Sequence, residues 1–498
     1  MAENEILSQA SVDNGVKVVQ TDVGNKDGQV KCPKCGSTDI STNAGTGQLR
    51  CNFCRFEFEP QRLTMETDIS KLSGTTIGSG AQDIVADTKD QITLKCTSCG
   101  AEVVIDTASA NQARCHWCRN TLSLNQQIPN GAIPDVVLAF KVKKDEAKQA
   151  IERFVGKRKF YAHPKFKQEF TTNNIMGVYF PYMVVDLNAH SNLVGLGEHQ
   201  TRSYSEGSGE HRVTYYDADL YQVGRDFDLT IHGLSIESNK DRLDTTNKTK
   251  TNNIINSIMP FDVENSVKYD SNYLKGFTSE RRDTNISDLT SIVTERAKDV
   301  ARFAANPSLK NYGRGVSWQT EQLEIKGQQW KSAYLPVWLY SYQEEKSDRK
   351  ILHYVAVNAR TKESMGSVPI YLPKLFLFAF LVEILGFTGF VKLNIGYSFL
   401  LLLSGPLYFF YIYTRYRNQN ARDYYETETK TNISNLKTLD IFVEHRKRLE
   451  NSSIENRNDN IVRGASMNLK KKAVLGLDLD LKNITADQLS SITDHFFK

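Results

Sequence analysis

Eight cysteines, all within the first 118 residues, are the side chains of this sequence with the clearest capacity for chemistry. They form four Cys-x-x-Cys pairs, arranged as two modules in which fifteen residues separate the first pair from the second. A Cys-x-x-Cys pair at a tight turn presents two thiolates to one ion, and two such pairs complete a closed tetrahedral site, which is the structural zinc pattern. The spacing therefore predicts two Zn²⁺ sites, with ligands Cys32, Cys35, Cys51 and Cys54 in the first module and Cys96, Cys99, Cys115 and Cys118 in the second.

Two other kinds of cysteine site compete with zinc. A redox dithiol would need a thioredoxin-like βαβ context, and an iron–sulfur cluster uses other spacings. The first residues carry no apolar signal segment, so we expect a cytoplasmic, reducing compartment, where paired cysteines bind metal more often than they form disulfides. Gly36 and Gly100 directly follow their second cysteines, where a knuckle turn favours positive φ. With four cysteines available, we do not expect His116 to be a ligand.

Nucleic-acid binding is an alternative role for such modules. Residues 31–62 carry five Lys or Arg against three acids, a surplus that a Zn²⁺ with four thiolates cancels. Residues 95–119 carry three against two, so the second module is net negative once it holds metal. Phosphate binding needs a clustered positive surface, and the net charge of the whole chain is only +4. Aromatic side chains could stack on bases, but in so small a module we expect them to cover the metal site: Phe53, Phe56, Phe58 and Trp117.

The common enzyme signatures are missing from the sequence. It has no Gly-x₄-Gly-Lys-Ser/Thr phosphate loop, no Gly-x-Ser-x-Gly elbow, no His-Glu-x-x-His and no complete Gly-x-Gly-x-x-Gly. A group of histidines and aspartates could in principle form a site, but its polar flanks favour exposed histidines on a hairpin loop. The members of this group are His190, His199, His211, His232, Asp186, Asp217 and Asp219.

The elements that must position the cysteines follow from changes of pattern along the chain. Polar residues without periodicity predict a flexible tail, Gly, Ser, Thr and Asp predict a flexible linker between the modules, and alternating strand patterns mixed with two helical ones predict an α+β core. The predicted division is a tail at 1–30, zinc ribbon 1 at 31–60, a linker at 61–93, zinc ribbon 2 at 94–125, the α+β core at 130–370, an apolar helical hairpin at 371–414 and a partly helical C-terminal tail at 415–498.

Within the core, apolar spacing predicts one amphipathic helix that buries Ala147, Ile151, Phe154 and Val155, and a second over about 288–305. Residues 178–185 and 333–340 align as a weak repeat that shares Tyr-x-Pro, unless two aromatic-rich strands merely resemble each other. Because proline cannot donate to a sheet ladder, we expect Pro181 and Pro336 at strand entries or edges.

Two apolar runs, 375–391 and 395–414, are joined by only three residues. Runs of 17 and 20 residues approximate the length that crosses a bilayer, so they predict a transmembrane helical hairpin, with a buried hairpin of a soluble protein as the alternative. Glu383 lies in the middle of the first run, where we expect it to make a neutral hydrogen bond to the partner helix; a relay or contact site is the alternative.

Charge asymmetry predicts the orientation of the hairpin. Its connecting turn holds only Lys392, whereas basic residues flank both outer ends, so the positive-inside rule places both ends, and with them the main domains, in the cytoplasm. The flanking residues are Arg360, Lys362 and Lys374 before the hairpin and Arg415, Arg417 and Arg422 after it.

The chain resembles a family of bacterial membrane proteins whose N-terminal zinc ribbons are similar to that of transcription factor IIB. Beyond the cysteines, the resemblance rests on four segments: Gly177 to Pro181, Pro260-Phe261-Asp262 with Tyr269-Asp270 and Tyr273 to Phe277, Tyr334 to Leu339, and the strand-turn-strand from Tyr354 to Gly366. Such proteins are sometimes labelled primosomal replication helicases, but no ATP-binding motif here supports that activity. Where the family often has glycines in the last turn, this chain has Asn358-Ala359-Arg360-Thr361-Lys362, which puts a ligand-binding role of the turn in doubt.

The resemblance implies company with phage-shock-type and flotillin-like membrane proteins and a scaffold role in envelope maintenance. Because closed Cys₄ sites leave no coordination position for a substrate water, we expect no zinc catalysis. The main hypothesis is a non-enzymatic, membrane-tethered adaptor or scaffold whose zinc ribbons bind protein partners. The alternatives are a membrane-tethered nucleic-acid-binding protein of replication or DNA maintenance, and an uncharacterised hydrolase.

Overall fold

A computed structural model of the chain describes most of residues 134–416 and shorter stretches on either side of them. In full, it describes residues 11–13, 16–19, 32–37, 40–42, 48–60, 62–63, 68–84, 91–95, 101–106, 113–117, 121–122, 127–128, 134–171, 174–206, 213–239, 255, 258–269, 271–274, 277–280, 282–346, 349–393, 398–416 and 429–450.

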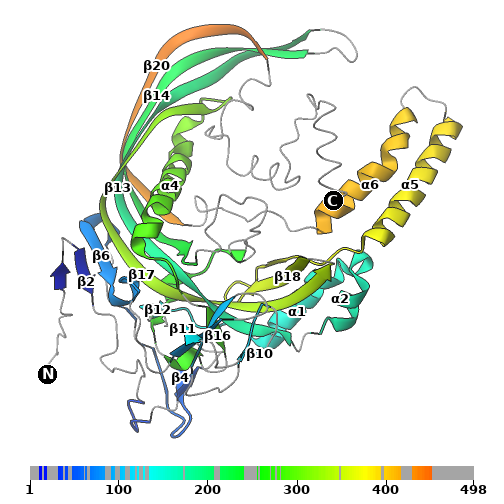
Figure 1. Cartoon of the computed structure of the whole chain (residues 1–498). Helices are drawn as coiled ribbons and strands as arrows, with labels where there is room; N and C mark the ends of the chain where they lie inside the picture. The colour runs from blue at the N-terminus through cyan, green and yellow to red at the C-terminus, as the bar shows by residue number, and fades with distance from the viewer. Residues whose placement is uncertain are drawn as a thin grey trace.

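One large mixed sheet organises the described part of the chain, and four long strands form its centre. β13 (Met176–Glu206) pairs antiparallel with β17 (Val316–Lys346) on one side and with β14 (Val213–Glu237) on the other. β20 (Lys430–Glu450) pairs antiparallel with the far edge of β14. Together these strands rise from the lower part of the molecule as a curved arch (Figure 1).

The curvature of the arch coincides with irregular pairing. The β13–β14 ladder shifts register between Val185 and Leu187 and again between Gln200 and Arg202, and the β14–β20 ladder shifts at three places. A bulge bends its strand and increases the local twist. The bulges therefore let strands of more than twenty residues curl, where regular pairing would keep the sheet flatter.

The inner face of the arch is covered by α4 (Ile286–Ala305), as Figure 1 shows. The helix begins with a capping box formed by Asn285 and Asp288, in which the side chain of each residue faces the backbone N–H of the other. Its apolar stripe packs on residues of β13, β14 and β17, including Phe227 and Trp330. This confirms the helix predicted over about 288–305, and the buried stripe consists of Leu289, Val293, Ala297, Val300, Ala301 and Ala305.

At the base of the arch, α1 (Lys144–Gly156), the short η3 (Lys159–Tyr161) and α2 (Pro164–Glu169) cover one face of β17 and β18 (Arg349–Asn358). The buried residues of α1 are Ala147, Ile151, Phe154 and Val155, as its periodicity predicted. The smaller elements of this region are β12 (Val136–Val137), η7 (Val263–Asn265), β15 (Val267–Lys268), η8 (Ser271–Leu274), β16 (Thr278–Glu280) and β19 (Ser364–Gly366), whereas η9 (Asn306–Leu309) follows α4 and packs in its core.

The two prolines of the weak repeat do not lie at strand ends, contrary to expectation. Pro181 and Pro336 lie inside β13 and β17, whose repeat segments pair with each other, Val178 opposite Val337. Each proline comes one residue before a second ladder begins, at Tyr182 with β14 and at Val337 with β18. The missing N–H therefore falls at a ladder end, which explains how a central strand tolerates proline.

The N-terminal tail and the linker differ from the flexible segments that the sequence predicts. β1 (Ser11–Asp13) and β2 (Val16–Val19) lie in the predicted tail, and η1 (Ile69–Lys71), β6 (Gly74–Gly78) and η2 (Ser79–Ala81) lie in the predicted linker. β6 adds to the sheet as a parallel neighbour of both β17 and β2. Small side chains made this segment look like a linker, but they also let its backbone lie close against β17.

The second cysteine module also joins the large sheet. β7 (Gln91–Lys95) pairs with β8 (Glu102–Asp106) and β11 (Gln127–Ile128), and β8 pairs with β16. β9 (Ala113–Arg114) and β10 (Thr121–Leu122) form a separate pair. The described part of this module is therefore attached to the core and is not an independent ribbon.

The predicted partly helical C-terminal tail is wrong for residues 430–450, because these residues form β20. Ile433 packs against the core beneath α4, and Arg225 of β14, buried in the sheet, forms an ion pair with Asp440 at 2.8 Å. Most residues of β20 lie opposite a residue of β14, and the ladder hydrogen bonds, which alternate residues make, outweigh a weak helical pattern in the sequence.

α5 (Leu372–Leu393) is the one helix among the described residues that is long and apolar enough to cross a membrane, with a mean hydropathy of 1.9 over Leu372–Val391. η10 (Ser398–Leu403) and α6 (Ser404–Tyr416) pack back along it. A Cβ on Gly386 would lie 2.3 Å from the carbonyl oxygen of Leu401, so the two segments touch through their backbones there. Glu383 accepts a 2.7 Å hydrogen bond from the backbone N–H of Gly405, so it faces the neighbouring helix as expected.

We predict that Gly327→Ala destabilises the core. A Cβ at this position of β17 would lie 2.2 Å from the carbonyl carbon and oxygen of Leu72, which are backbone atoms that cannot rotate away. The free energy of unfolding should fall by about 1–3 kcal/mol, which is typical of overpacking. Tryptophan fluorescence should report this as a lower midpoint of denaturation. Gly313→Ala is the matched control because nothing lies within 4 Å of its Cβ, so its midpoint should not change. Equal midpoints for the two variants would contradict the close approach of Leu72, just before β6, to β17.

Candidate metal centre

The first cysteine module is a small three-stranded unit that carries two turns. β3 (Ile40–Thr42) pairs with β4 (Leu49–Cys51), and β4 pairs with β5 (Glu57–Phe58). Ile40 and Leu49 are fully buried because they insert into the same apolar core that α1 covers. The strands therefore hold the cysteine turns against the main body of the protein.

The two turns have the same geometry. The N–H of Gly36 donates to the carbonyl of Cys32, and the N–H of Arg55 donates to the carbonyl of Cys51, at 2.8 and 2.9 Å. Gly36 has φ +72°, as its place after the second cysteine predicted, and Arg55 adopts φ +61° at the equivalent place in the second turn. Two matching knuckles thus face each other, which is the arrangement that a four-thiolate site requires.

The four sulfur atoms of this module lie within 4.8 Å of one another. The Sγ atoms of Cys32 and Cys54 are 3.6 Å apart, and those of Cys35 and Cys51 are 3.5 Å apart. Zinc–sulfur bonds of about 2.3 Å in a tetrahedron place sulfurs about 3.8 Å apart, so the cluster has the size of a single Zn²⁺ site. The backbone N–H of Cys54 lowers the pKa of Cys51 to about 6, whereas, against the backbone N–H of Ser37, desolvation and the neighbouring thiols raise the pKa of Cys35.

The second predicted site lies mostly outside the described residues, since Cys96, Cys99 and Cys118 are not among them. Cys115 is fully buried in the core behind β13 and β17. His116, which we did not expect to be a ligand, places its Nε2 2.8 Å from Glu280, and the indole N–H of Trp117 donates to the same carboxylate oxygen. The ring of Trp117 packs edge-on against Phe180 and Tyr354.

The aromatic residues of the two modules differ in how exposed they are. Trp117 is 7% exposed and packs in the core, so it is not placed to stack on a nucleic-acid base. Phe58 packs on the core as well. Phe53, between the second pair of cysteines, is 81% exposed, and Phe56 is 39% exposed with Lys34 above its ring. Phe53 is thus exposed at the tip of a knuckle, contrary to the expectation that it covers the metal site.

The described histidines of the predicted group do not lie together, and they are on the strands β13 and β14 where a hairpin loop was expected. His190 lies between Asp226 and Asp228, with ring nitrogens 3.1 and 3.0 Å from their carboxylates. The hydrogen bond to Asp228 raises the pKa of His190. Partial burial lowers this pKa, and Asp226 raises it further. His445 of β20 lies 2.5 Å from Asp219, and His199 bonds the Asn311 carbonyl, whereas His211 is outside the described residues.

Asp186 and His232 line a cavity of about 300 Å³ that the sequence did not reveal. Asp186 is buried and accepts bonds from the Gly233 N–H at 2.9 Å and from Lys331 at 2.9 Å, while His232 Nδ1 lies 2.7 Å away. Burial alone would raise the pKa of Asp186, but His232 and Lys331 hold it below the usual range. The carboxylate is therefore fixed in its charged form, which suits a structural ion pair better than a proton-transfer role.

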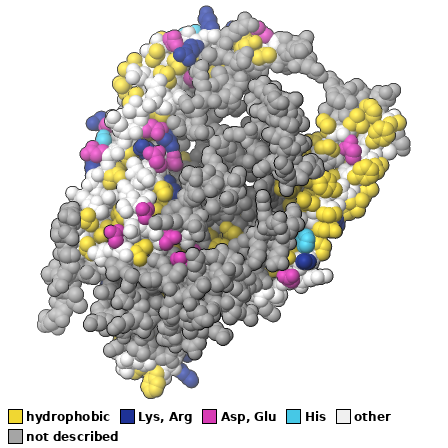
Figure 2. All heavy atoms as spheres, viewed as in Figure 1, with side chains coloured by type: hydrophobic (Ala, Val, Ile, Leu, Met, Phe, Trp, Pro, Cys, Tyr) yellow, Lys and Arg dark blue, Asp and Glu magenta, His cyan; other side chains and the backbone are white. Residues whose placement is uncertain are grey.

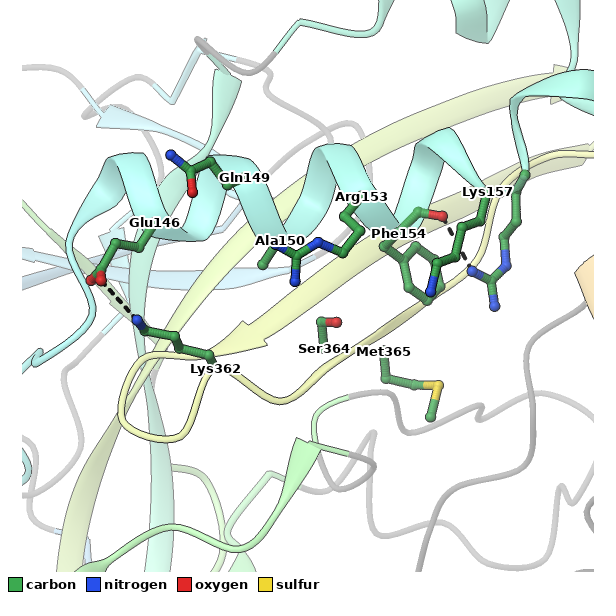
Figure 3. A pocket seen from close by; sticks show the side chains of 10 residues that line it. Glu146, Gln149, Ala150, Arg153, Phe154, Lys157, Lys362, Ser364 and Met365 are labelled. Carbon is green, nitrogen blue, oxygen red and sulfur yellow. Dashed lines mark hydrogen bonds and ion pairs between the residues drawn. The ribbon is translucent and has the colours of Figure 1, made fainter.

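A larger cavity, of about 550 Å³, lies between α1 and the turn before β19. Figure 3 shows Arg153 and Lys157 along the cavity side of α1, opposite Ser364 and Met365. Its only lining acid is Glu146, which pairs with Lys362 at 2.7 Å. The lining therefore lacks the pair of carboxylates or the nucleophile with a base that hydrolysis uses, and it favours anions.

The segments that carry the resemblance meet in the fold. Arg360 makes a two-pronged contact to Asp262, with bonds of 2.8 and 2.6 Å, and Asn358 donates to the carbonyls of Ile258 and Pro260. Asn358 also accepts from the N–H groups of Arg360 and Thr361. Asn358 and Arg360 thus lock the turn without glycines, so these residues have a structural explanation.

Comparison with family models, with curated proteins and with solved structures finds no match to this chain.

We predict that Cys51→Ser lowers the zinc content of the purified full-length chain by one equivalent, because three thiolates no longer close the first site. Asn52→Ala is the matched control: it changes the same turn but removes no thiolate. Metal analysis after gel filtration should show one zinc fewer for Cys51→Ser and an unchanged content for Asn52→Ala. Equal zinc contents for Cys51→Ser and the unaltered chain would contradict a metal site at these four cysteines.

Proposed function

We propose that this protein is a membrane-anchored, non-enzymatic adaptor whose zinc modules bind protein partners. The observation that carries the proposal is the first cysteine module: its four sulfurs converge, its base is buried in the core, and its tip presents Phe53 to solvent. A closed four-thiolate site has no open position for a substrate. An exposed aromatic residue on a rigid, metal-bound turn is suited to insertion into a pocket of a partner.

The anchor in this proposal is the α5–α6 pair, inserted as a transmembrane hairpin. α5 exposes a continuous apolar surface, whereas a core helix of a soluble protein would be mostly buried. Figure 2 shows hydrophobic side chains over much of the visible surface of this pair. Its large exposed apolar residues include Phe376, Leu377, Phe380, Leu381, Leu385, Phe387, Leu407 and Phe410.

Two further parts of the proposal come from the sequence. Both ends of the hairpin, and with them the sheet, lie on the cytoplasmic side, since basic residues flank the outer ends. A second Zn²⁺ binds Cys96, Cys99, Cys115 and Cys118. The resemblance to bacterial membrane proteins with zinc ribbons of the transcription factor IIB type makes phage-shock-type and flotillin-like membrane proteins the first partners to examine.

The alternatives have weaker support from the structure. Nucleic-acid binding loses one candidate stacking residue, because Trp117 is buried. Among the described residues, the strongest candidate for a hydrolase is the Asp186–His232 pair, whose carboxylate is already engaged by Gly233 and Lys331. The exposed Phe53 would suit base stacking as well as a protein pocket, so the case against nucleic acid rests on the small basic surplus of the cysteine modules, which bound metal cancels.

We predict the topology from the charge asymmetry. A cysteine introduced as Asn394→Cys, between the two apolar segments, should react with a membrane-impermeant thiol reagent added to whole cells. Gln200→Cys and Glu450→Cys should react only after the cells are opened, because both positions belong to the cytoplasmic sheet. Labelling of either control in intact cells would contradict the orientation.

We predict that Phe53→Ala reduces the recovery of crosslinked membrane-protein partners from cells while leaving the zinc content unchanged. Val213→Ala is the matched control, since Val213 is also an exposed apolar residue, 41% exposed, but on β14. A Cys32→Ser, Cys96→Ser double variant should lose the same partners together with its zinc. Recovery of DNA or RNA that survives a wash at about 0.2 M salt would favour the nucleic-acid reader instead.

A further inference from the structure

A strongly basic segment runs from the last turn of α1 through η3 into α2. Residues 153–168 contain six Lys or Arg and no Asp or Glu. This segment, which we call the basic collar, lies at the base of α5: the N–H of Tyr371 donates to the carbonyl of Tyr161 at 2.8 Å, and Ala162 bridges to Ile370. The basic residues of the collar are Arg153, Lys157, Arg158, Lys159, Lys165 and Lys167.

The collar also contacts the second apolar segment. The hydroxyls of Tyr161 and Tyr408 are 2.5 Å apart, and Tyr161, Leu375 and Ile412 form a small apolar cluster. Figure 2 shows basic and histidine side chains at this base, directly below the apolar surface of the α5–α6 pair. If α5 enters the hydrocarbon, the collar lies at the level of the lipid headgroups.

Two lysines of this region converge on one atom. Lys167 and Lys374 both donate to the carbonyl oxygen of Phe160, at 3.3 and 3.0 Å, although they come from α2 and α5. Lys374 also lies over the ring of Phe160, 3.7 Å from its centre. Among the described residues, no carboxylate forms an ion pair with Lys159, Lys167 or Lys374, so their positive charge is not neutralised within this part of the chain.

The charges of these lysines act on one another. Partial burial and then the charges of Lys374 and Lys159 lower the pKa of Lys167. An anion placed among the three ammonium groups would relieve this repulsion. Phe160 is 50% exposed beside them, and its ring packs edge-on against Phe378 of α5. Tyrosine, the residue type enriched at the boundary between lipid headgroups and hydrocarbon, is present beside them as Tyr161 and Tyr408.

We propose that Lys159, Lys167 and Lys374 form a binding site for the phosphate of an anionic phospholipid headgroup, with Phe160 at the edge of the acyl chains. The site rests on the proposed insertion of α5 in the membrane. A headgroup phosphate fits better than an acidic protein segment because the site is continuous with the apolar surface of α5, where an acyl chain would lie. Lipid bound here would fix the angle between the hairpin and the sheet.

The test uses the full-length chain reconstituted into vesicles of phosphatidylcholine alone or with one-fifth phosphatidylglycerol. After mild detergent extraction, mass spectrometry measures the ratio of the two lipids that remain bound to the protein. The unaltered chain should enrich phosphatidylglycerol over its share of the bilayer. In a Lys159→Gln, Lys167→Gln variant, the enrichment of phosphatidylglycerol should fall about five-fold for each lysine replaced. This is the change expected for one lysine near an anionic surface.

A matched control is Lys144→Gln, Lys310→Gln, which removes the same charge from exposed positions away from the collar, and it should keep the enrichment. Melting temperatures of all variants separate lipid loss from unfolding. Equal enrichment in the collar variant and the unaltered chain overturns the site. So does displacement of phosphatidylglycerol by millimolar inorganic phosphate, which would make it a site for the free ion.

The same vesicles separate this proposal from the anchoring on which it rests. Retention of the chain after an alkaline wash in both kinds of vesicle, without enrichment of phosphatidylglycerol, overturns the lipid site alone. Release of the chain by that wash from both kinds of vesicle overturns the anchoring as well.

Discussion

The antiparallel ladder between β13 and β17 is the interaction on which the rest of the fold depends. It runs from Met176 opposite Leu339 to Gly197 opposite Val316, and β6, β12, β14, β16 and β18 each pair directly with one of its two strands. β14 and through it β20 extend the β13 side, while β6, β12 and β18 share the β17 side. Because side chains alternate along a strand, one ladder supplies both faces: Tyr179 points into the core under α1 and Phe180 into the core that holds Trp117.

That alternation connects the cysteine modules to opposite faces of the same sheet. The first module completes the core on the α1 side through Ile40 and Leu49, and the second inserts Cys115 and Trp117 on the other. Metal binding at the first module would therefore be coupled to packing of the sheet, because β4 carries both Cys51 and the buried Leu49. A linker that held the modules loosely would not give this coupling, and the observed β6 holds the chain between them against β17.

The sequence predicted those features that interactions between residues close in the chain determine. The buried face of α1, the extent of α4 and the grouping of four cysteines follow from spacing alone, since helical periodicity and a tight turn each involve residues close in the chain. The strands β6 and β20 could not be predicted in the same way. β6 is rich in glycine and threonine, and β20 is exposed on both faces with apolar residues such as Leu439 and Phe442, so only pairing with distant partners determines their conformation.

The candidate site shows the same division. The ligands were predictable from spacing, but the exposure of Phe53, the burial of Trp117 and the contact of Arg360 with Asp262 depend on segments that are far apart in sequence. Asp186 and His232 belonged to the group of histidines and aspartates considered from the sequence, but their pairing could not be predicted, since they lie on two strands whose register the sequence does not state. No motif would have indicated the convergence of Lys167 and Lys374 on Phe160.

The position of β20 has a consequence for how the chain folds during synthesis. β14 ends at Glu237 and its neighbour begins at Lys430, so 192 residues (430 − 237 − 1) separate two strands that lie side by side. At about 5–20 residues per second, the ribosome needs roughly 10–40 seconds to make them. During that interval the outer edge of β14 is complete but has no neighbouring strand. The apolar segments α5 and α6 leave the ribosome before β20 does. The edge that closes last is thus exposed to other chains for longest, which makes the hydrogen-bonding groups of β14 the natural point of recognition for a chaperone or of misassembly between nascent copies.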